Sequence, residues 1–284
     1  MSRSAQDVVR SAATVCSPPQ VYQKLLEVIN HPRSGPADVA KVLGEDAGLT
    51  SRLLKLVNSA MFSFPQRIGN VTHAVQVVGT AQVRDLALAT SIVSTFDGVP
   101  EDLVDMESFW RHSLVCGVAA RVLAGQRREN NVERFFVVGL LHDVGRLVLF
   151  LVAPDAAREA IERTRVHGEL LHDAERAVLG FDHTHVGAAL MTQWNFPAVF
   201  AEVLGYHHSP AMASHFPVET AAVHVSDVIA NGLRIGSSGQ HLVPSLDEGA
   251  FAQLGIDPGL APLLLDDIER QYKDAAYVQF GLDT

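Results

Sequence analysis

Apolar residues recur along most of the chain at the three- and four-residue spacing of an amphipathic α-helix. Early examples are Val21, Leu25, Val28 and Ile29, followed by the leucine-rich run over residues 49–57. Side chains at this spacing share one helix face, so each segment is expected to bury that face. No run of strict alternation is long enough for a sheet. The pattern predicts an all-α protein.

Turn-forming residues divide the predicted helices into two lobes. About five short helices precede Asp97-Gly98-Val99-Pro100, where Gly and Pro interrupt regular structure. Longer helices follow over about residues 107–125, 132–152, 154–168, 170–180, 183–194, 197–208 and 218–231. The Gly- and Ser-rich residues 232–249 predict a loop or partly mobile connector before a last helix over 258–277. We predict an N-terminal extension (1–16), an N-terminal helical lobe (17–98), a second helical lobe (99–232), and a C-terminal loop and helix (233–284).

Composition and charge narrow the class of protein. A net charge of −10 repels phosphate backbones, so nucleic-acid binding is not expected. Neither Cys16 nor Cys116 belongs to a C-x-x-C pair, which argues against a disulfide framework or a thiolate metal site. The most apolar stretch, residues 135–152, is interrupted by His142 and Asp143. No signal peptide or membrane span is indicated, and we expect a cytoplasmic protein.

Histidine and aspartate residues gather in the second lobe, at helix ends and on inward helix faces. His142-Asp143 follows an apolar run with Gly139 one turn before it, and His112 shares a helix face with Phe109. Burying such groups costs several kcal/mol unless they are paired or bind a metal. Mixed imidazole and carboxylate donors suit Fe, Mn, Zn or Ni better than Ca or Mg. The candidate ligands are His112, His142, Asp143, His183, His207, His208 and Asp227.

These residues predict one or two metal ions. One ion would be held by His112, His142, Asp143 and Asp227, and a second by His183, His207 and His208 with Asp143 as the bridge. Two such ions would activate a water for attack on phosphorus. Taken singly, an inward histidine is more often a hydrogen-bonded core residue than a ligand. His172-Asp173 repeats the dipeptide on a polar helix and is interpreted as a solvated surface pair.

The order of these motifs resembles the HD superfamily. The segments that carry the resemblance are Trp110–Ser113, Gly139–Arg146, Asp182-His183 with Val186-Gly187, Tyr206–His208, and Ser226-Asp227. The first lobe resembles the HDOD family specifically, through Pro18-Pro19 with Val21, Asp46–Thr50 leading to Leu53-Leu54, Asn58–Phe62, and Ala74-Val75 leading to Val78-Gly79. Together these matches cover about residues 17–232. The resemblance implies an all-α output domain of bacterial signalling, with sensors or cyclic-dinucleotide enzymes as partners.

The chain is also similar to the HD-GYP cyclic-di-GMP phosphodiesterases, whose metal ligands fall on all the candidate positions. Three features depart from those enzymes. No Gly-Tyr-Pro follows His208, Arg146 replaces a lysine, and Ser108 stands where some of them have a glutamate. Asp143 and Arg146 are the candidate catalytic residues. Arg146 would either clamp a phosphate or neutralise Asp143 in a metal-free protein.

Three functions are consistent with the sequence, in this order. The first is a signalling module that binds partner proteins through its helical surface, with the second lobe as a metal-stabilised or nucleotide-sensing core. The second is a metal-dependent phosphohydrolase or phosphodiesterase acting on a nucleotide or cyclic dinucleotide. The third is a scaffold whose histidines satisfy one another. In the first lobe, Asn58-Ser59 is interpreted as a helix cap without chemistry.

Overall fold

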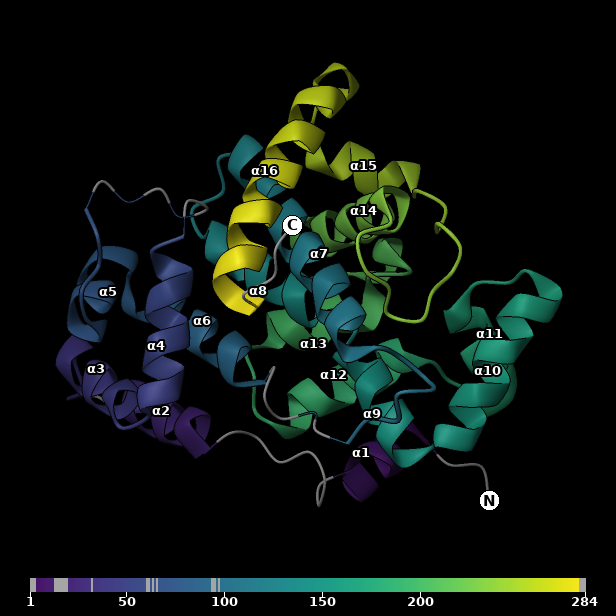
Figure 1. Cartoon of the computed structure of the whole chain (residues 1–284), viewed down its shortest axis with the longest axis horizontal. Helices are drawn as coiled ribbons and strands as arrows, with labels where there is room; N and C mark the ends of the chain where they lie inside the picture. Colours follow the sequence, from purple (N-terminus) through teal and green to yellow (C-terminus); the bar gives the residue numbers. More distant parts are fainter. Residues whose placement is uncertain are drawn as a thin grey trace. The chain divides into compact units, whose positions relative to one another are not determined.

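The computed structural model describes residues 4–12, 20–31, 33–59, 62, 64, 66–92, 96 and 98–280. Four groups of residues named above lie outside this part of the chain: Cys16, Pro18-Pro19, Ala60-Met61 and Asp97. Every regular element in the described ranges is a helix and none is a strand, which confirms the all-α prediction (Figure 1). The chain forms a smaller unit, residues 18–95 and 265–284, and a larger unit, residues 1–17 and 96–264.

The smaller unit consists mostly of short helices, and side chains cap both ends of one of them, α4 (Ala47–Val57). The helices are α2 (Gln20–Asn30), α3 (Pro36–Gly44), α4, α5 (Val71–Val78) and α6 (Thr80–Ile92), with α16 (Ala261–Phe280) from residue 265 onward. Asp46 accepts a hydrogen bond from the Leu49 amide at the start of α4. At its end, Asn58 donates to the carbonyls of Leu54 and Ile68 and accepts from the Ile68 amide. Asn58 therefore has the structural role that its position predicts.

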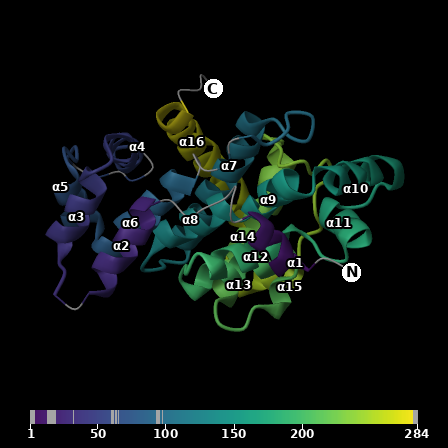
Figure 2. The same ribbon diagram turned by 90° about the horizontal axis from the view of Figure 1, so that it is seen from below.

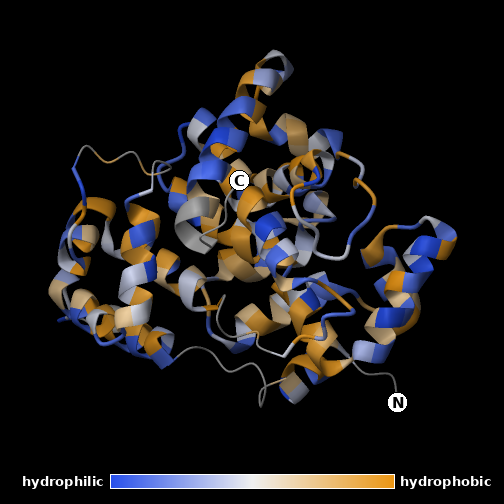
Figure 3. Cartoon of the chain, viewed as in Figure 1, coloured by the Kyte–Doolittle hydropathy of each residue, from blue (hydrophilic) through white to orange (hydrophobic). Residues whose placement is uncertain are grey.

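The larger unit contains helices of 7–21 residues around an apolar core. They are α1 (Ala5–Ala12), α7 (Met106–Gln126), α8 (Val132–Leu141), α9 (Val144–Val152), α10 (Pro154–His167), α11 (Leu171–Leu179), α12 (His183–Gln193), α13 (Ala198–Tyr206), α14 (Pro217–Leu233) and α15 (Glu248–Leu254), with the 3₁₀ turns Pro210–Met212 and Pro258–Leu260. Figure 2 shows α12, α13 and α14 beside one another. In Figure 3, α10 and α11 each carry hydrophilic and hydrophobic residues, in keeping with their amphipathic sequences.

The N-terminal extension contains a helix that the sequence analysis did not predict. Helix α1 packs against α9 and α12 and buries Val8, Val9 and Ala12. Its apolar positions recur at offsets of three and four residues, so the signal is present but covers only two turns. The short α15 was likewise not predicted, because it follows a stretch without periodicity.

The apolar stretch over residues 132–152 was predicted as one helix, and this was wrong. It is divided into α8 and α9 at His142 and Asp143, which end the first helix and begin the second. By length and composition the stretch is long enough to cross a membrane, but 89% of its most apolar window is buried inside the protein. It is therefore a core element of the larger unit, and the break turns two polar side chains toward its centre.

Close backbone contacts hold the helices that carry these side chains. A Cβ atom on Gly139 of α8 would lie 2.8 Å from the Cα atom of Gly117 on α7. A Cβ atom on Gly145 of α9 would lie 2.1 Å from the carbonyl oxygen of His183 on α12. Only glycine permits helices to approach this closely. The two contacts set the distance of α7 and α12 from the junction of α8 and α9.

Candidate metal centre

The seven candidate ligands of the sequence analysis converge within the larger unit. His112 comes from α7, His142 and Asp143 from the junction of α8 and α9, His183 from the start of α12, His207 and His208 from the end of α13, and Asp227 from α14. No side chain among them is more than 6% exposed. Residues that are far apart in sequence thus form one buried cluster, which we call the His/Asp cluster.

Asp143 lies at the centre of the His/Asp cluster. Its Oδ1 atom is 3.1 Å from Nε2 of His183 and 3.8 Å from Nε2 of His207. Its Oδ2 atom is 3.3 Å from Nε2 of His142 and 3.9 Å from Nε2 of His112. Potential donor atoms lie within 4.8 Å of one another in two groups that share Asp143. The carboxylate is therefore placed to bridge two sets of imidazoles.

Asp227 completes one side of the cluster. Its Oδ1 atom is 3.2 Å from Nε2 of His112 and 3.6 Å from Nε2 of His142, while Oδ2 is 3.9 Å from Nδ1 of His208. Oδ1 also accepts a hydrogen bond of 2.8 Å from Nδ2 of Asn231, one turn later on α14. Asn231 was not predicted from the sequence, although its spacing of four residues from Asp227 places it on the same helix face.

The hydrogen bonds of the histidines leave ligand atoms free for a metal. Nδ1 of His142 contacts the Gly139 carbonyl at 2.7 Å, and Nδ1 of His207 contacts the Leu204 carbonyl at 3.0 Å. A carbonyl only accepts, so both Nδ1 atoms donate and both Nε2 atoms point inward. These Nε2 atoms are buried and make no hydrogen bond to the described residues, and neither does Oδ1 of Asp143. Such orphaned nitrogen and oxygen donors fit a divalent transition metal.

Electrostatics distinguish His207 and His208 from His142. Burial and the neighbouring His142 and His183 lower the pKa of His207 to about 3, and burial together with His207 lowers that of His208 well below its ordinary value. Burial also opposes protonation of His142, but the negative charge of Asp143 overcomes it and raises the pKa. His207 and His208 are therefore neutral, as metal ligands must be, whereas His142 holds a proton that a cation would displace.

The two carboxylates of the cluster are ionised. Burial raises the pKa of Asp143, but the charges of Arg146 and His142 hold it well below its ordinary value. Burial likewise raises the pKa of Asp227, but the nearby imidazoles of His112 and His142 lower it further than burial raises it. Buried negative charge of this kind requires a positive partner. A divalent metal ion and a protonated imidazole both meet that requirement.

Arg146 is one such positive partner. Its side chain is 2% exposed, and its Nη1 atom lies 2.9 Å from Oδ2 of Asp143. Its Nε atom is 3.7 Å from Oε1 of Glu175, a residue that the sequence analysis did not single out. This geometry matches the ion-pair interpretation of Arg146. As a phosphate clamp, the guanidinium would first have to leave Asp143.

A loop that we call the strap, residues 235–247, covers Arg146. Nη1 of Arg146 donates to the hydroxyl of Ser238, which is fully buried. The Ser237 amide donates to the Ser108 carbonyl at the start of α7, and Oε1 of Gln240 accepts from the Leu171 amide. The sequence predicted a loop here, and it is one, but Ser238 is buried against Arg146. Composition rich in Gly and Ser does not reveal contacts of this kind.

The interpretation of His172-Asp173 as a solvated pair was wrong for His172. The ring of His172 is buried and stacks on His208, with ring centroids 4.2 Å apart. Its local neighbours in sequence are polar, but the residue that covers it comes from the end of α13. Asp173 is half exposed, as predicted. His172 therefore forms a wall of the cluster.

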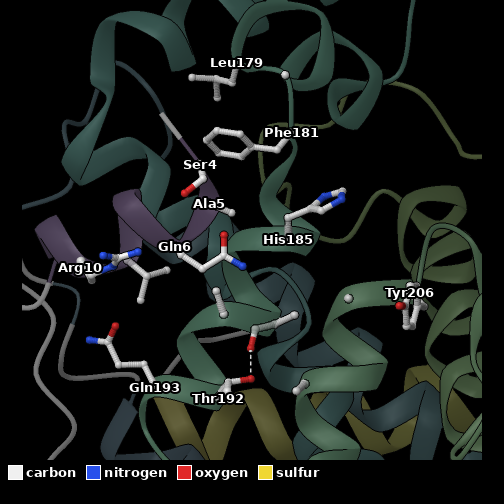
Figure 4. Close-up of a pocket in the computed structure, with 16 residues that line it drawn as sticks. Ser4, Ala5, Gln6, Arg10, Leu179, Phe181, His185, Thr192, Gln193 and Tyr206 are labelled. Carbon is white, nitrogen blue, oxygen red and sulfur yellow. Dashed lines mark hydrogen bonds between the residues drawn. The ribbon is translucent and has the colours of Figure 1, made fainter. Parts of the chain in front are cut away.

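A surface pocket of about 910 Å³ lies apart from the cluster, between α1, α12 and α13. Figure 4 shows Gln6 and Arg10 of α1 on one side of it, with His185 and Tyr206 on the other. His185 is 55% exposed and contacts Asp182, the residue that caps α12. Helix α12 thus directs His183 into the core and His185 toward the surface.

Solved structures with this fold are known from several bacteria. An HDOD domain protein with unknown function from Geobacter sulfurreducens has a TM-score of 0.76 at 22% identity, over 96% of this chain and 98% of that one. A candidate phosphohydrolase from Shewanella amazonensis SB2B has a TM-score of 0.73 at 22% identity, over 96% of this chain and 97% of that one. A candidate signal transduction protein from Marinobacter aquaeolei VT8 has a TM-score of 0.73 at 20% identity, over 95% of this chain and 60% of that one. These likenesses show the shared fold.

Sequence comparisons agree with the fold. An uncharacterized protein of Treponema pallidum (strain Nichols) is 26% identical over 195 residues. The match covers 67% of this chain and 37% of that protein, so the chain spans little more than a third of that relative's length. The model of the HDOD domain matches residues 15–210, more than half of the chain. The chain therefore belongs to the HDOD domain family.

Proposed function

We propose that this protein is a signal-transduction output module of the HDOD type, with a divalent metal ion in the His/Asp cluster as part of its core. The observation that carries the proposal is the enclosure of the cluster. Its candidate ligands are at most 6% exposed, and Ser238 covers Arg146. A substrate has no direct access to such a site, whereas a stabilising ion does not need access after folding.

The donor set would hold the ion through imidazole nitrogens and the oxygens of Asp143 and Asp227. When bound, a divalent cation such as Fe, Mn, Zn or Ni supplies positive charge at the point where two carboxylates meet. The protein keeps His207 neutral and orients its Nε2 atom inward through the Leu204 carbonyl. Ion binding would then hold six helices of the larger unit together, because α7, α8, α9, α12, α13 and α14 each supply or adjoin a ligand.

The partners in this proposal are other signalling proteins of the bacterial cytoplasm, either a sensor or a cyclic-dinucleotide enzyme. The family resemblance supports such partners, and a nucleotide ligand is a further option. Both would be recognised by the helical surface, since the cluster itself is enclosed. A partner would bind the exposed faces of the helices that the ion holds in place.

A second candidate function is metal-dependent phosphohydrolysis. The convergence of all seven candidate ligands favours it, as does the fold shared with a candidate phosphohydrolase. In this case the strap would have to open so that Arg146 can exchange Asp143 for a phosphate oxygen. The two functions therefore differ in whether the cluster becomes accessible.

Metal analysis and turnover assays separate these functions. The protein would be purified without chelator, its metal content measured, and the Fe- and Mn-loaded forms assayed with a cyclic dinucleotide, a nucleotide and a generic phosphodiester. Bound metal without turnover supports the signalling module. Turnover that is lost in Asp143→Asn establishes the hydrolase instead. Less than one equivalent of metal, with unchanged stability in His142→Ala, leaves only the inert scaffold.

A further inference from the structure

A buried carboxylate outside the predicted ligand set contacts one of the ligands directly. Glu175 of α11 is 3% exposed. Its Oε2 atom lies 2.6 Å from Nδ1 of His183 and accepts the backbone amide of the same residue at 2.9 Å. Two hydrogen bonds from one residue to one carboxylate oxygen fix both the backbone and the ring of His183. Glu175 thereby connects α11 to the first residue of α12.

The partner of Nδ1 distinguishes His183 from the other histidines of the cluster. Nδ1 of His142 and of His207 donates to a neutral carbonyl of the preceding helical turn. Nδ1 of His112 has no hydrogen-bond partner among the described residues, and Nδ1 of His208 is 3.9 Å from a carboxylate oxygen. Within the cluster, only His183 has a carboxylate at hydrogen-bond distance from Nδ1. This difference indicates a specific role for Glu175.

Glu175 is paired with two groups beside the cluster, and the first of them is His183. A buried carboxylate is costly unless it is paired. Its second partner is Arg146, whose Nε atom is 3.7 Å from Oε1. Glu175 therefore holds both Arg146 and His183, the two groups that contact Asp143 from the side of α9 and α12.

We propose that Glu175 is a positioning residue of the metal centre: it holds His183 as the Nδ1–H tautomer, with Nε2 directed at the metal, and increases the affinity of that ligand. A hydrogen bond from a ligating histidine to a carboxylate fixes the ring orientation and makes the imidazole more basic. Outer partners of this type change metal affinity roughly 10- to 100-fold. The inference rests on the proposed metal centre and identifies a residue that acts on it without touching the ion.

The test is the affinity of the intact protein for Co²⁺, measured by competition with a chelator and by the ligand-field absorption of the bound ion. Glu175→Gln removes the charge and leaves one acceptor oxygen for two N–H groups. We expect roughly 10- to 100-fold weaker binding and an altered Co²⁺ spectrum. The matched control is Glu162→Gln on α10, where the side chain is 65% exposed; its affinity and spectrum should equal those of the wild type.

The outcomes separate this inference from the proposed function. If the wild type binds no Co²⁺, the metal centre itself is refuted. If the wild type binds Co²⁺ and Glu175→Gln binds it equally well with the same spectrum, only the role of Glu175 is refuted, even where the variant unfolds at a lower temperature. If Glu175→Gln does not fold, Glu175→Asp replaces it in the test. This variant keeps the negative charge but moves it away from His183 by the length of one methylene group. Unchanged Co²⁺ affinity in Glu175→Asp would also overturn the inference.

Discussion

Replacement of Gly145 by alanine tests whether the approach of α9 to α12 sets the geometry of the cluster. A Cβ atom at this position would lie 2.1 Å from the carbonyl oxygen of His183 and 2.7 Å from the amide nitrogen of Gly187. Both neighbours are backbone atoms, which cannot rotate away as a side chain would. The two helices must therefore separate, and the segment that moves begins with the ligand His183.

The expected cost follows from overpacking of a dense core, which is about 1–3 kcal/mol. For a protein of this size each kcal/mol lowers the melting temperature by about 2–4 °C. We therefore expect Gly145→Ala to unfold about 2–12 °C below the wild type without metal. Displacement of His183 should also weaken metal binding, so added metal should raise the melting temperature of the variant less than that of the wild type.

Thermal unfolding with and without Co²⁺ is the assay, and Gly125→Ala is the control. Gly125 lies near the end of α7, and a Cβ atom there meets nothing within 4 Å. Because alanine loses less conformational freedom than glycine on folding, this variant should be as stable as the wild type or up to about 1 kcal/mol more stable. Equal melting temperatures for Gly145→Ala and the wild type, or an equal loss in both variants, would refute the reasoning.

Three further predictions concern polar groups. Arg146→Ala leaves Asp143 and Glu175 without their cation. The free energy of unfolding of the metal-free variant, measured in urea, should therefore be about 3–5 kcal/mol lower than that of the wild type. A loss below about 1 kcal/mol would contradict the ion pair. Asn58→Asp keeps the shape but loses two donated hydrogen bonds, so it should cost about 1–3 kcal/mol with unchanged metal content; altered metal content would argue for chemistry at that site. Burial lowers the pKa of His183, but Glu175 and Asp143 raise it to about 9, whereas that of His207 falls to about 3. The free energy of unfolding of the metal-free protein should therefore be greatest near pH 6.5. It should decline toward pH 9, because His183 loses its proton in the folded protein, and toward pH 3, because His207 gains a proton only in the unfolded chain. A flat pH profile in urea unfolding would contradict this.

Helix periodicity was sufficient to predict the all-α fold and most of the helices that carry the cluster. It also placed His112 and Asp227 on inward faces, because their apolar neighbours recur at offsets of three and four residues. The break between α8 and α9 was not visible, since apolar residues continue on both sides of His142 and Asp143. Periodicity indicates which face of a helix is buried. It does not show where the chain changes direction between two helices that are both buried.

His172 and Glu175 show where local reasoning about a site fails. Both lie on a helix with polar neighbours, and on that basis the sequence placed this segment in solvent. The groups that cover them, His208 and His183, come from the other side of the cluster and are close only after folding. Ser238 is similar, because its role depends on Arg146, which lies 92 residues earlier in the chain. Partners distant in sequence have no local signal.

The charges of the cluster, Arg146 and Glu175 balance one another. Three carboxylates, Asp143, Asp227 and Glu175, are buried around the site, and Arg146 neutralises one of them. Without a metal, the raised pKa values of His142 and His183 place the missing positive charge on those rings. A divalent cation supplies the same charge and leaves both rings neutral, as ligation requires. The interior is therefore near neutrality with or without the ion, which is why stability toward alkaline pH and metal affinity depend on the same residues.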